Sequence, residues 1–198
     1  MQIIFSTHNN GKIKEIRAVL AGLPIEILSA EEAGVFEDVI EDGATLTANA
    51  LKKARFVAEK KGGWAIADDT GVFIDALDGA PGVYAARWLG EGLAEEEKAR
   101  QTIAKISDVT EDKRGGYFET IVALVSPDKE EWVFSGRVQG KFATELRGVN
   151  RPQLPYDLIF IPEGFDQTFA EMSDEQKNLL SHRGEAFRKL KEFLQTYV

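Results

Sequence analysis

Short apolar runs alternate with amphipathic stretches along the chain, so that predicted strands are followed by predicted helices. The predicted strands cover residues 2–6, 23–29, 64–67, 72–75, 117–126, 132–139 and 156–161. The predicted helices cover residues 45–60 and 95–106 and begin near residues 12, 173 and 181. Residues 127–130 suit the turn of a hairpin between two of these strands.

The stretch at residues 64–75 is the most informative, because an apolar run delivers Asp68, Asp69, Thr70 and Gly71 and then resumes. This pattern predicts a buried strand that opens into a turn at a functional site. Successive strand residues face opposite sides, so we expect the two carboxylates to do different jobs. Carboxylates suit Mg²⁺, which leaves its other positions to water and phosphates. A purely structural polar turn is the alternative.

Residues 7–12 form a polar loop between the first predicted strand and the first predicted helix. Such a loop places backbone N–H groups and the positive end of the helix dipole at one point, where a phosphate can bind. Lys12 adds a positive charge there. No P-loop motif occurs, so an ordinary helix start is the alternative explanation.

Three further residues are open to two interpretations each. Lys53, four residues after Asn49 on a predicted helix, is either a solvated surface lysine or a cation that projects over the central pair of aspartates. His182 and Arg183 begin the terminal helix, where they either cap it or point outward together as hydrogen-bond donors. For His182 alone, a structural role is the default expectation.

Composition limits the class of protein. The 198 residues, 43% of them hydrophobic, are enough for one large domain or two tightly joined lobes. The net charge of −9 disfavours a long polyanion as partner but permits a small anion chelated by a metal ion. Six carboxylates fall within residues 31–42, a run typical of a solvated surface.

With no cysteine and two histidines, the chain has no disulfide framework, thiolate nucleophile or cysteine-based zinc site. It shows no signal-peptide pattern and no apolar run of about 20 residues. We therefore expect a soluble cytoplasmic protein that binds neither membranes nor nucleic acid polymers.

Six short motifs, taken in chain order, resemble the pattern of the inosine triphosphate pyrophosphatase family. They are T-H-N-N-G-K at 7–12, G-A-T-L at 43–46, N-A-L-K-K-A at 49–54, A-D-D-T-G at 67–71, G-A-P-G at 79–82 and S-H-R at 181–183. One such motif is a weak signal, whereas six in the family's order, over nearly the whole chain, are highly specific.

The resemblance implies an α/β fold with two lobes around a long mixed β-sheet flanked by helices, and an active site in the cleft between the lobes. Residues 1–198 would then form a single catalytic domain. It also implies hydrolysis of ITP, dITP and XTP to a monophosphate and pyrophosphate, which keeps deaminated purines out of DNA and RNA. Mg²⁺ would be the cofactor, a small nucleotide the partner and a homodimer the usual assembly.

By the same resemblance, Asp69 is the general base that activates water, and it shares a metal ion with Glu41. Asp42 and Asp68 are alternative second metal ligands. The residues expected to bind substrate are Thr7, His8, Asn9, Asn10, Gly11, Lys12, Lys53, Thr70, Leu154, Pro155, Tyr156, Asp157, Lys177, His182 and Arg183.

Within that set, the three lysines would hold the triphosphate by their charge. Tyr156 would stack on the purine, and His182 and Arg183 would donate to its 6-oxo group.

Two departures from the family pattern bear on function. Ala48 stands where the family has glutamate, and P-Q-L-P-Y-D-L at 152–158 stands where the family reads G-G-F-G-Y-D-P. Leu154 thus replaces a stacking phenylalanine, and stacking on a base is worth about 1–3 kcal/mol. We expect weakened or redirected base recognition and a lower rate. The alternative functions are a nucleotide-binding protein with low activity and a pyrophosphatase with altered base specificity.

Overall fold

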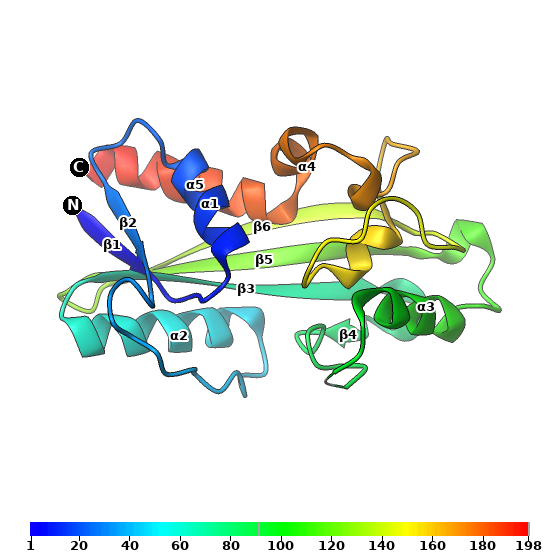
Figure 1. Cartoon of the computed structure of the whole chain (residues 1–198), viewed down its shortest axis with the longest axis horizontal. Helices are drawn as coiled ribbons and strands as arrows, with labels where there is room; N and C mark the ends of the chain where they lie inside the picture. Colours follow the sequence, from blue (N-terminus) through cyan, green and yellow to red (C-terminus); the bar gives the residue numbers. More distant parts are fainter. Residues whose placement is uncertain (91, 198) are drawn as a thin grey trace. The chain divides into compact units, whose positions relative to one another are not determined.

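A long strand at residues 64–74 lies inside one mixed β-sheet in the computed structural model, which describes residues 1–90 and 92–197 (Figure 1). The strands are β1 (Gln2–Phe5), β2 (Glu26–Ser29), β3 (Trp64–Ile74), β4 (Pro81–Gly82), β5 (Gly115–Val125), β6 (Glu131–Phe142) and β7 (Phe160–Pro162). Within the described ranges they pair in the order β2-β1-β3-β5-β6-β7, and β4 also pairs with β3. β1 is parallel to β2 and β3, whereas the β3–β4 and β6–β7 pairs are antiparallel. The predicted mixed sheet flanked by helices is confirmed.

The chain forms two compact units. The first contains residues 1–70 and 120–136 and the chain from His182 onward, and the second contains residues 71–119 and 137–181. The long strands β3, β5 and β6 each contribute one half to either unit. Each unit has a hydrophobic core of its own.

In the first unit, helices cover both faces of the strands. The helices are α1 (Asn10–Val19), α2 (Leu46–Lys61) and α5 (His182–Tyr197). Figure 1 shows α1 and α5 on one side of the strands and α2 on the other. Apolar side chains of α1 and α5, such as Ile16, Phe187 and Leu190, pack against Phe5 and Ile66 of the strands. This packing follows from the helical apolar stripes that the sequence shows.

In the second unit, short helices pack around the other halves of the long strands. They are η1 (Asp75–Leu77), α3 (Glu95–Lys105), η2 (Glu111–Lys113), η3 (Pro155–Leu158), η4 (Phe169–Glu171) and α4 (Asp174–Leu180), where η marks a 3₁₀-helix. Phe118, Phe142, Phe160 and Phe169 form the centre of this core. The helix predicted to begin near residue 173 is α4, and Ser173 and Gln176 form a capping box at its start.

Two local predictions are wrong. Residues 68–71 do not form a turn, because β3 continues through them without interruption. Residues 156–161 do not form one strand, because a 3₁₀-helix that begins at Pro155 ends at Leu158 and β7 begins only at Phe160. Proline fixes φ near the helical value and is favoured in the first turn of a helix, which explains the second error.

None of the helices within residues 1–90 and 92–197 is both long and apolar enough to cross a membrane.

Candidate active site

Strand β3 carries the two central aspartates to opposite faces of the sheet. Asp68 and Asp69 are 1% and 7% exposed, so both carboxylates are buried and need partners. Asp68 contacts groups at the starts of α1 and α5, whereas Asp69 contacts side chains of α2. The alternation of side chains along a strand therefore gives the two carboxylates different partners, as predicted from the sequence.

Asp68 is a structural anion held between two cations. The ammonium of Lys12 donates to Asp68 Oδ1 at 2.9 Å, and Arg183 Nε donates to Asp68 Oδ2 at 3.3 Å. Burial by itself would raise the pKa of Asp68, but the charges of Lys12, Arg183 and Lys53 outweigh burial and hold that pKa well below its ordinary value. Asp68 therefore stays ionised and ties the start of α1 to the start of α5.

Asp69 has the opposite character. Asn49 Nδ2 donates to Asp69 Oδ2 at 3.0 Å, and the ammonium of Lys53 lies 3.8 Å from Asp69 Oδ1. Burial, with the negative charge of Glu41 as a further cause, raises the pKa of Asp69 to about 6, although Lys53 acts against this shift. A carboxylate with this pKa is ionised near neutral pH and is more basic than an ordinary aspartate, as a general base requires.

Lys53 is the cation that contacts the acidic groups on the Asp69 side of the sheet. Its ammonium donates to Glu41 Oε1 and, at 2.6 Å, to the carbonyl oxygen of Asp68, in addition to its contact with Asp69. Burial would lower the pKa of Lys53, but the three nearby carboxylates raise it above its ordinary value. The interpretation of Lys53 as a cation at the central pair is therefore correct, and the solvated alternative is wrong.

The predicted metal ligands, Asp69 and Glu41, both lie beside the ammonium of Lys53. Among residues 1–90 and 92–197, no group of three or more histidine, cysteine or acidic side chains converges as a metal site. Two neighbouring carboxylates suit Mg²⁺, which usually binds to one or two protein carboxylates and takes water and substrate phosphate as its other ligands. The donor set is therefore compatible with the predicted cofactor.

The polar loop at residues 7–12 caps α1 as well as exposing polar groups. Asn9 is the N-cap, and its side-chain oxygen accepts from the amides of Gly11 and Lys12 at 2.8 and 3.2 Å. The hydroxyl of Thr7 accepts from the amide of Asn9 at 3.2 Å. Two of the amides expected to receive a phosphate are thus bonded to Asn9, so an anion at this loop would have to compete with that cap.

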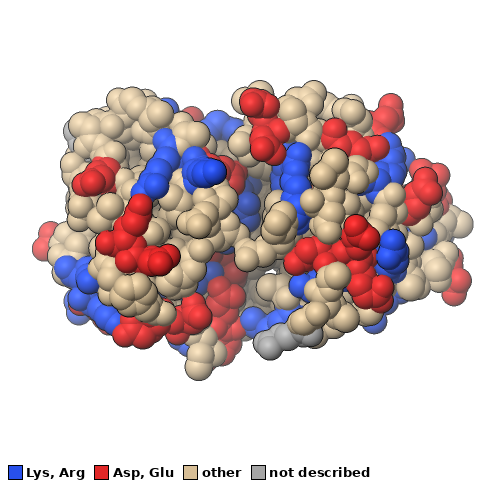
Figure 2. Space-filling view, viewed as in Figure 1, with Lys and Arg blue, Asp and Glu red and all other residues tan. Residues whose placement is uncertain are grey.

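The acidic run at residues 31–42 is mostly exposed to solvent, as predicted, and Glu41 alone among its carboxylates is partly buried. Five of its six carboxylates pair with a basic side chain: Glu32 with Arg17, Glu37 with Lys60, Asp38 with His8, Glu41 with Lys53 and Asp42 with Lys52. On the face drawn in Figure 2, acidic and basic side chains likewise lie beside one another. The His8 pair, at 3.5 Å between Nε2 and Asp38 Oδ1, connects the loop at 7–12 to the segment that carries Glu41.

Thr70 and His182 have largely structural surroundings within the first unit. The hydroxyl of Thr70 lies 2.7 Å from the hydroxyl of Thr120 on β5. His182 is 5% exposed at the first position of α5, and a Cβ built on Gly136 of β6 would lie 2.0 Å from the His182 carbonyl oxygen. Glycine at 136 is therefore required for the close approach of β6 to the start of α5.

The predicted residues of the second unit form a separate set of contacts. Lys177 and Asp157 make a buried ion pair, and the Lys177 ammonium lies 5.7 Å from the Phe169 ring centre. The Tyr156 hydroxyl donates to the carbonyl of Ala85 at 3.0 Å, and the residue is 6% exposed. Burial, and then the charge of Glu95, raises the pKa of Tyr156, so this phenol stays protonated.

Leu154 and Pro155 precede these residues; Leu154 is half-buried and Pro155 is buried as the first residue of η3. That the residues of the second unit act on the same substrate as Asp69 stays a prediction. The predicted position of the site, in a cleft between two lobes, likewise stays a prediction.

Comparison with known proteins identifies the family. A profile of the Ham1 family matches residues 3–193. The chain belongs to the Ham1 family. It is 43% identical over 195 residues to the dITP/XTP pyrophosphatase of Caldanaerobacter subterraneus subsp. tengcongensis, covering 98% of this chain and 96% of that protein. It is 41% identical over 191 residues to the dITP/XTP pyrophosphatase of Streptomyces coelicolor, covering 96% and 94%.

Solved structures of Ham1 proteins agree with this assignment. The Staphylococcus aureus Ham1 protein superposes with a TM-score of 0.90 at 32% identity over 100% of both chains. The Coxiella burnetii HAM1 protein gives a TM-score of 0.91 at 31% identity over 99% of both chains. The resemblance recognised from six motifs is therefore confirmed.

One residue of this Ham1 site was not predicted. Asn49 is 0% exposed and contacts Asp69 directly, whereas in the sequence it only marked one face of a helix and the start of the N-A-L-K-K-A motif. Its spacing of four residues before Lys53 was the available signal, because residues four apart lie on one face of a helix.

The structure shows what Ala48 and Gln153 do at two positions where the sequence departs from the family pattern. Ala48 is exposed at the third position of α2, where its amide donates to the Thr45 hydroxyl at 3.1 Å. A glutamate at this position can complete a capping box. Gln153 has a φ of +62°, so the loop keeps a left-handed conformation at a position where the family pattern has glycine.

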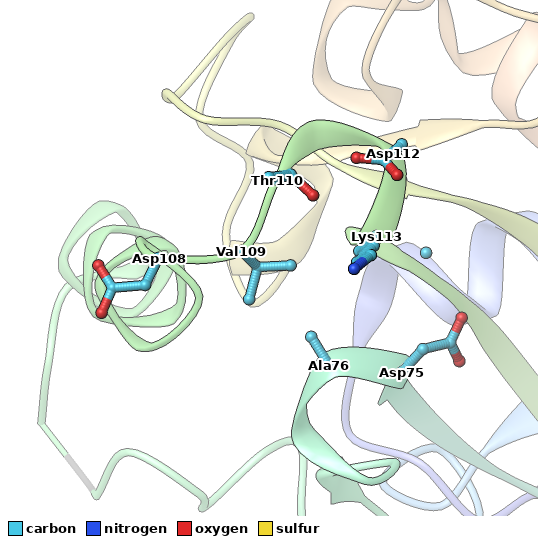
Figure 3. A pocket seen from close by; sticks show the side chains of 8 residues that line it. Asp75, Ala76, Asp108, Val109, Thr110, Asp112 and Lys113 are labelled. Carbon is cyan, nitrogen blue, oxygen red and sulfur yellow. The ribbon is translucent and has the colours of Figure 1, made fainter.

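A depression of about 600 Å³ in the second unit is lined by Asp75, Asp108, Asp112 and Lys113, among others (Figure 3). None of the predicted site residues lines it.

Proposed function

We propose that this Ham1 protein hydrolyses ITP, dITP and XTP to the corresponding monophosphate and pyrophosphate. The observation that carries the proposal is the pair of adjacent aspartates on β3. One is kept ionised by Lys12 and Arg183, and the other has a pKa raised to about 6. The relatives named dITP/XTP pyrophosphatase, at about 40% identity over nearly the whole chain, support this choice of substrate.

Asp69 is the proposed general base. Its carboxylate takes a proton from the attacking water, and its raised pKa makes it a stronger base than an ordinary aspartate. Asn49 holds one carboxylate oxygen, so the other oxygen, on the side of Lys53, is the one that faces the attacking water. Asp69 and Glu41 would also hold Mg²⁺, which when bound neutralises phosphate charge and lowers the pKa of water.

The cations of the first unit would bind the triphosphate. Lys12 and Lys53 each carry an ammonium within the predicted site, and both already contact a carboxylate or carbonyl of β3. These fixed cations need little rearrangement when charge develops on the phosphate oxygens, which is how a preorganised site stabilises a transition state. Binding in this manner would require the Asn9 cap to open or the anion to approach Lys12 beside it.

We propose that base recognition comes from Tyr156, His182 and Arg183 together with Leu154, as the family pattern implies. In this structure Arg183 also contacts Glu15 at 3.5 Å and Asp68, so its guanidinium is already oriented before a base arrives. Lys177, which the family pattern also assigns to the phosphates, is paired with Asp157 in this structure, as Lys12 is paired with Asp68.

We further propose a cytoplasmic homodimer that acts on free nucleotides. A net charge of −9 disfavours nucleic acid polymers as ligands. Sedimentation velocity tests the assembly, since a monomeric mass at micromolar concentration would contradict it.

The test of the activity is pyrophosphate release from a panel of nucleoside triphosphates in the presence of Mg²⁺. Release from ITP, dITP or XTP that disappears in Asp69→Asn supports the proposal. Binding of these nucleotides without release would favour the alternative of a binding protein with low turnover. Release confined to another nucleotide would favour altered base specificity. The reason to expect such a change is the P-Q-L-P sequence at 152–155, which departs from the family pattern.

A further inference from the structure

A single buried carboxamide connects the two carboxylates assigned to the reaction. Asn49 is fully buried near the start of α2. Its Nδ2 donates to Asp69 Oδ2 at 3.0 Å, and its Oδ1 accepts from the backbone amide of Gly43 at 2.8 Å. Gly43 lies two residues after Glu41. Asn49 therefore holds both the backbone segment that carries Glu41 and the side chain of Asp69.

The chemistry at this position requires asparagine. The group facing Asp69 must donate, and the group facing the Gly43 amide must accept, and a short carboxamide offers both. Aspartate keeps the acceptor but loses the donor and sets two carboxylates against each other. Leucine has a similar size but makes neither bond and leaves a buried amide without its acceptor.

The contact also requires glycine at position 43. A Cβ built on Gly43 would lie 2.6 Å from Asn49 Oδ1 and 2.9 Å from the Cβ of Ala48. Both distances are too short for a side chain, so the segment approaches α2 this closely only because residue 43 is glycine. The approach is thus built into two residues of the chain and does not depend on flexible surface groups.

We propose that Asn49 is a positioning residue, which fixes the Asp69 carboxylate and the Glu41 segment relative to each other through one side chain. Lys53, one helical turn later on α2, contacts both carboxylates, so α2 supplies the group that sets their spacing and the cation between them. Asn49 touches neither substrate nor attacking water in this account. The proposal rests on the proposed pyrophosphatase activity, since it explains how that activity's two carboxylates are held.

Two substitutions separate the two halves of the contact. Asn49→Asp keeps the acceptor for Gly43 and removes the donor to Asp69, whereas Asn49→Leu removes both. Ser126→Ala is the matched control, because Ser126 is buried in the same unit and its hydroxyl accepts from the amide of Glu130, in the β5–β6 turn.

The first measurement is steady-state kinetics of pyrophosphate release. For Asn49→Asp we expect kcat to fall about 100-fold with KM for the nucleotide changed less than threefold, since a misplaced catalytic group costs about this much in rate. Asn49→Leu should in addition raise the Mg²⁺ concentration needed for half-maximal rate. Ser126→Ala should keep kcat within twofold. A wild-type kcat in Asn49→Asp would overturn the proposal.

The second measurement does not depend on activity. Hydrogen exchange at the Gly43 amide should stay slow in Asn49→Asp and become at least tenfold faster in Asn49→Leu, because only the aspartate keeps the acceptor. The double variant Asn49→Asp with Asp69→Asn exchanges donor and acceptor, so adding Asp69→Asn should raise the urea midpoint more in the Asn49→Asp protein than in the wild type. Unchanged exchange in Asn49→Leu, or an equal rise in the two backgrounds, would overturn the proposal.

These outcomes distinguish failure of the proposed function from failure of the proposed role of Asn49. If the wild-type protein releases no pyrophosphate from any nucleotide, the proposed function fails, and the exchange and unfolding results alone decide whether Asn49 holds Asp69 and Gly43 together.

Discussion

Replacing the proposed base by its uncharged isostere should stabilise the protein while it abolishes turnover. The pKa of Asp69 rises from an ordinary value of 3.8 to about 6 because the carboxyl is buried. Each pKa unit corresponds to about 1.4 kcal/mol, so ionised Asp69 costs the folded state about 3 kcal/mol. Asp69→Asn removes this cost and keeps an oxygen that accepts from Asn49 Nδ2.

The sign of the effect depends on pH. Well below pH 3.8 the carboxyl is protonated in both folded and unfolded chains, so the variant gains nothing there, and at pH 4 it gains little. Between pH 4 and pH 6 the unfolded chain releases this proton while the folded chain retains it, and wild-type stability falls relative to the variant. Above pH 7 the difference should level off at about 3 kcal/mol in favour of Asp69→Asn.

The assay is urea unfolding at pH 4, 5, 6 and 8 in EDTA, so that no metal ion compensates the charge. Asp128→Asn is the control, since Asp128 is exposed in the turn between β5 and β6 and makes the same change of charge. An equal difference between wild type and Asp69→Asn at pH 4 and pH 8, or a variant less stable at pH 8, would refute the reasoning. Retained turnover in Asp69→Asn would refute the assignment of the base.

Three further substitutions test other parts of the account. Ala48→Glu should raise the free energy of unfolding by about 0.5–1 kcal/mol, because α2 has no acidic residue in its first turn. The kcat should stay within twofold, and a large rise in kcat would instead show that a carboxylate at position 48 takes part in the reaction. Lys177→Met should cost about 3–5 kcal/mol in urea unfolding by leaving Asp157 buried without its partner, and adding Asp157→Leu should recover most of the loss. An unchanged midpoint in Lys177→Met would contradict the importance of this pair. Leu154→Phe should lower KM for XTP at least fivefold, since a ring that stacks on the base contributes about 1 kcal/mol or more, and an unchanged KM would place residue 154 away from the base.

Local patterns in the sequence were sufficient for most of the framework. The predicted helix at residues 45–60 appears as α2 (Leu46–Lys61), and the predicted hairpin appears as β5 and β6. Both have strong periodicity or clear turn signals, which depend only on residues close together in the chain. The order of motifs then indicated which loops and helices carry functional groups.

Contacts distant in sequence explain what the local patterns missed. Two adjacent aspartates in an apolar run resembled a turn, but β3 continues because Lys12, 56 residues away from Asp68, and Arg183, 115 residues away, compensate the buried charge. Asn49 lies 20 residues before Asp69, so its contact with the base was likewise not visible. Local pattern cannot show which cation will meet a buried carboxylate.

The central claim is that this Ham1 protein selects deaminated purine nucleotides and cuts them to monophosphate and pyrophosphate. The most direct test is a competition in one tube between equal concentrations of XTP and GTP with Mg²⁺, followed by chromatography of all products. We predict that XTP is converted to its monophosphate and pyrophosphate while most of the GTP remains. Equal consumption of both nucleotides, release of orthophosphate in place of pyrophosphate, or no consumption of XTP would contradict the account.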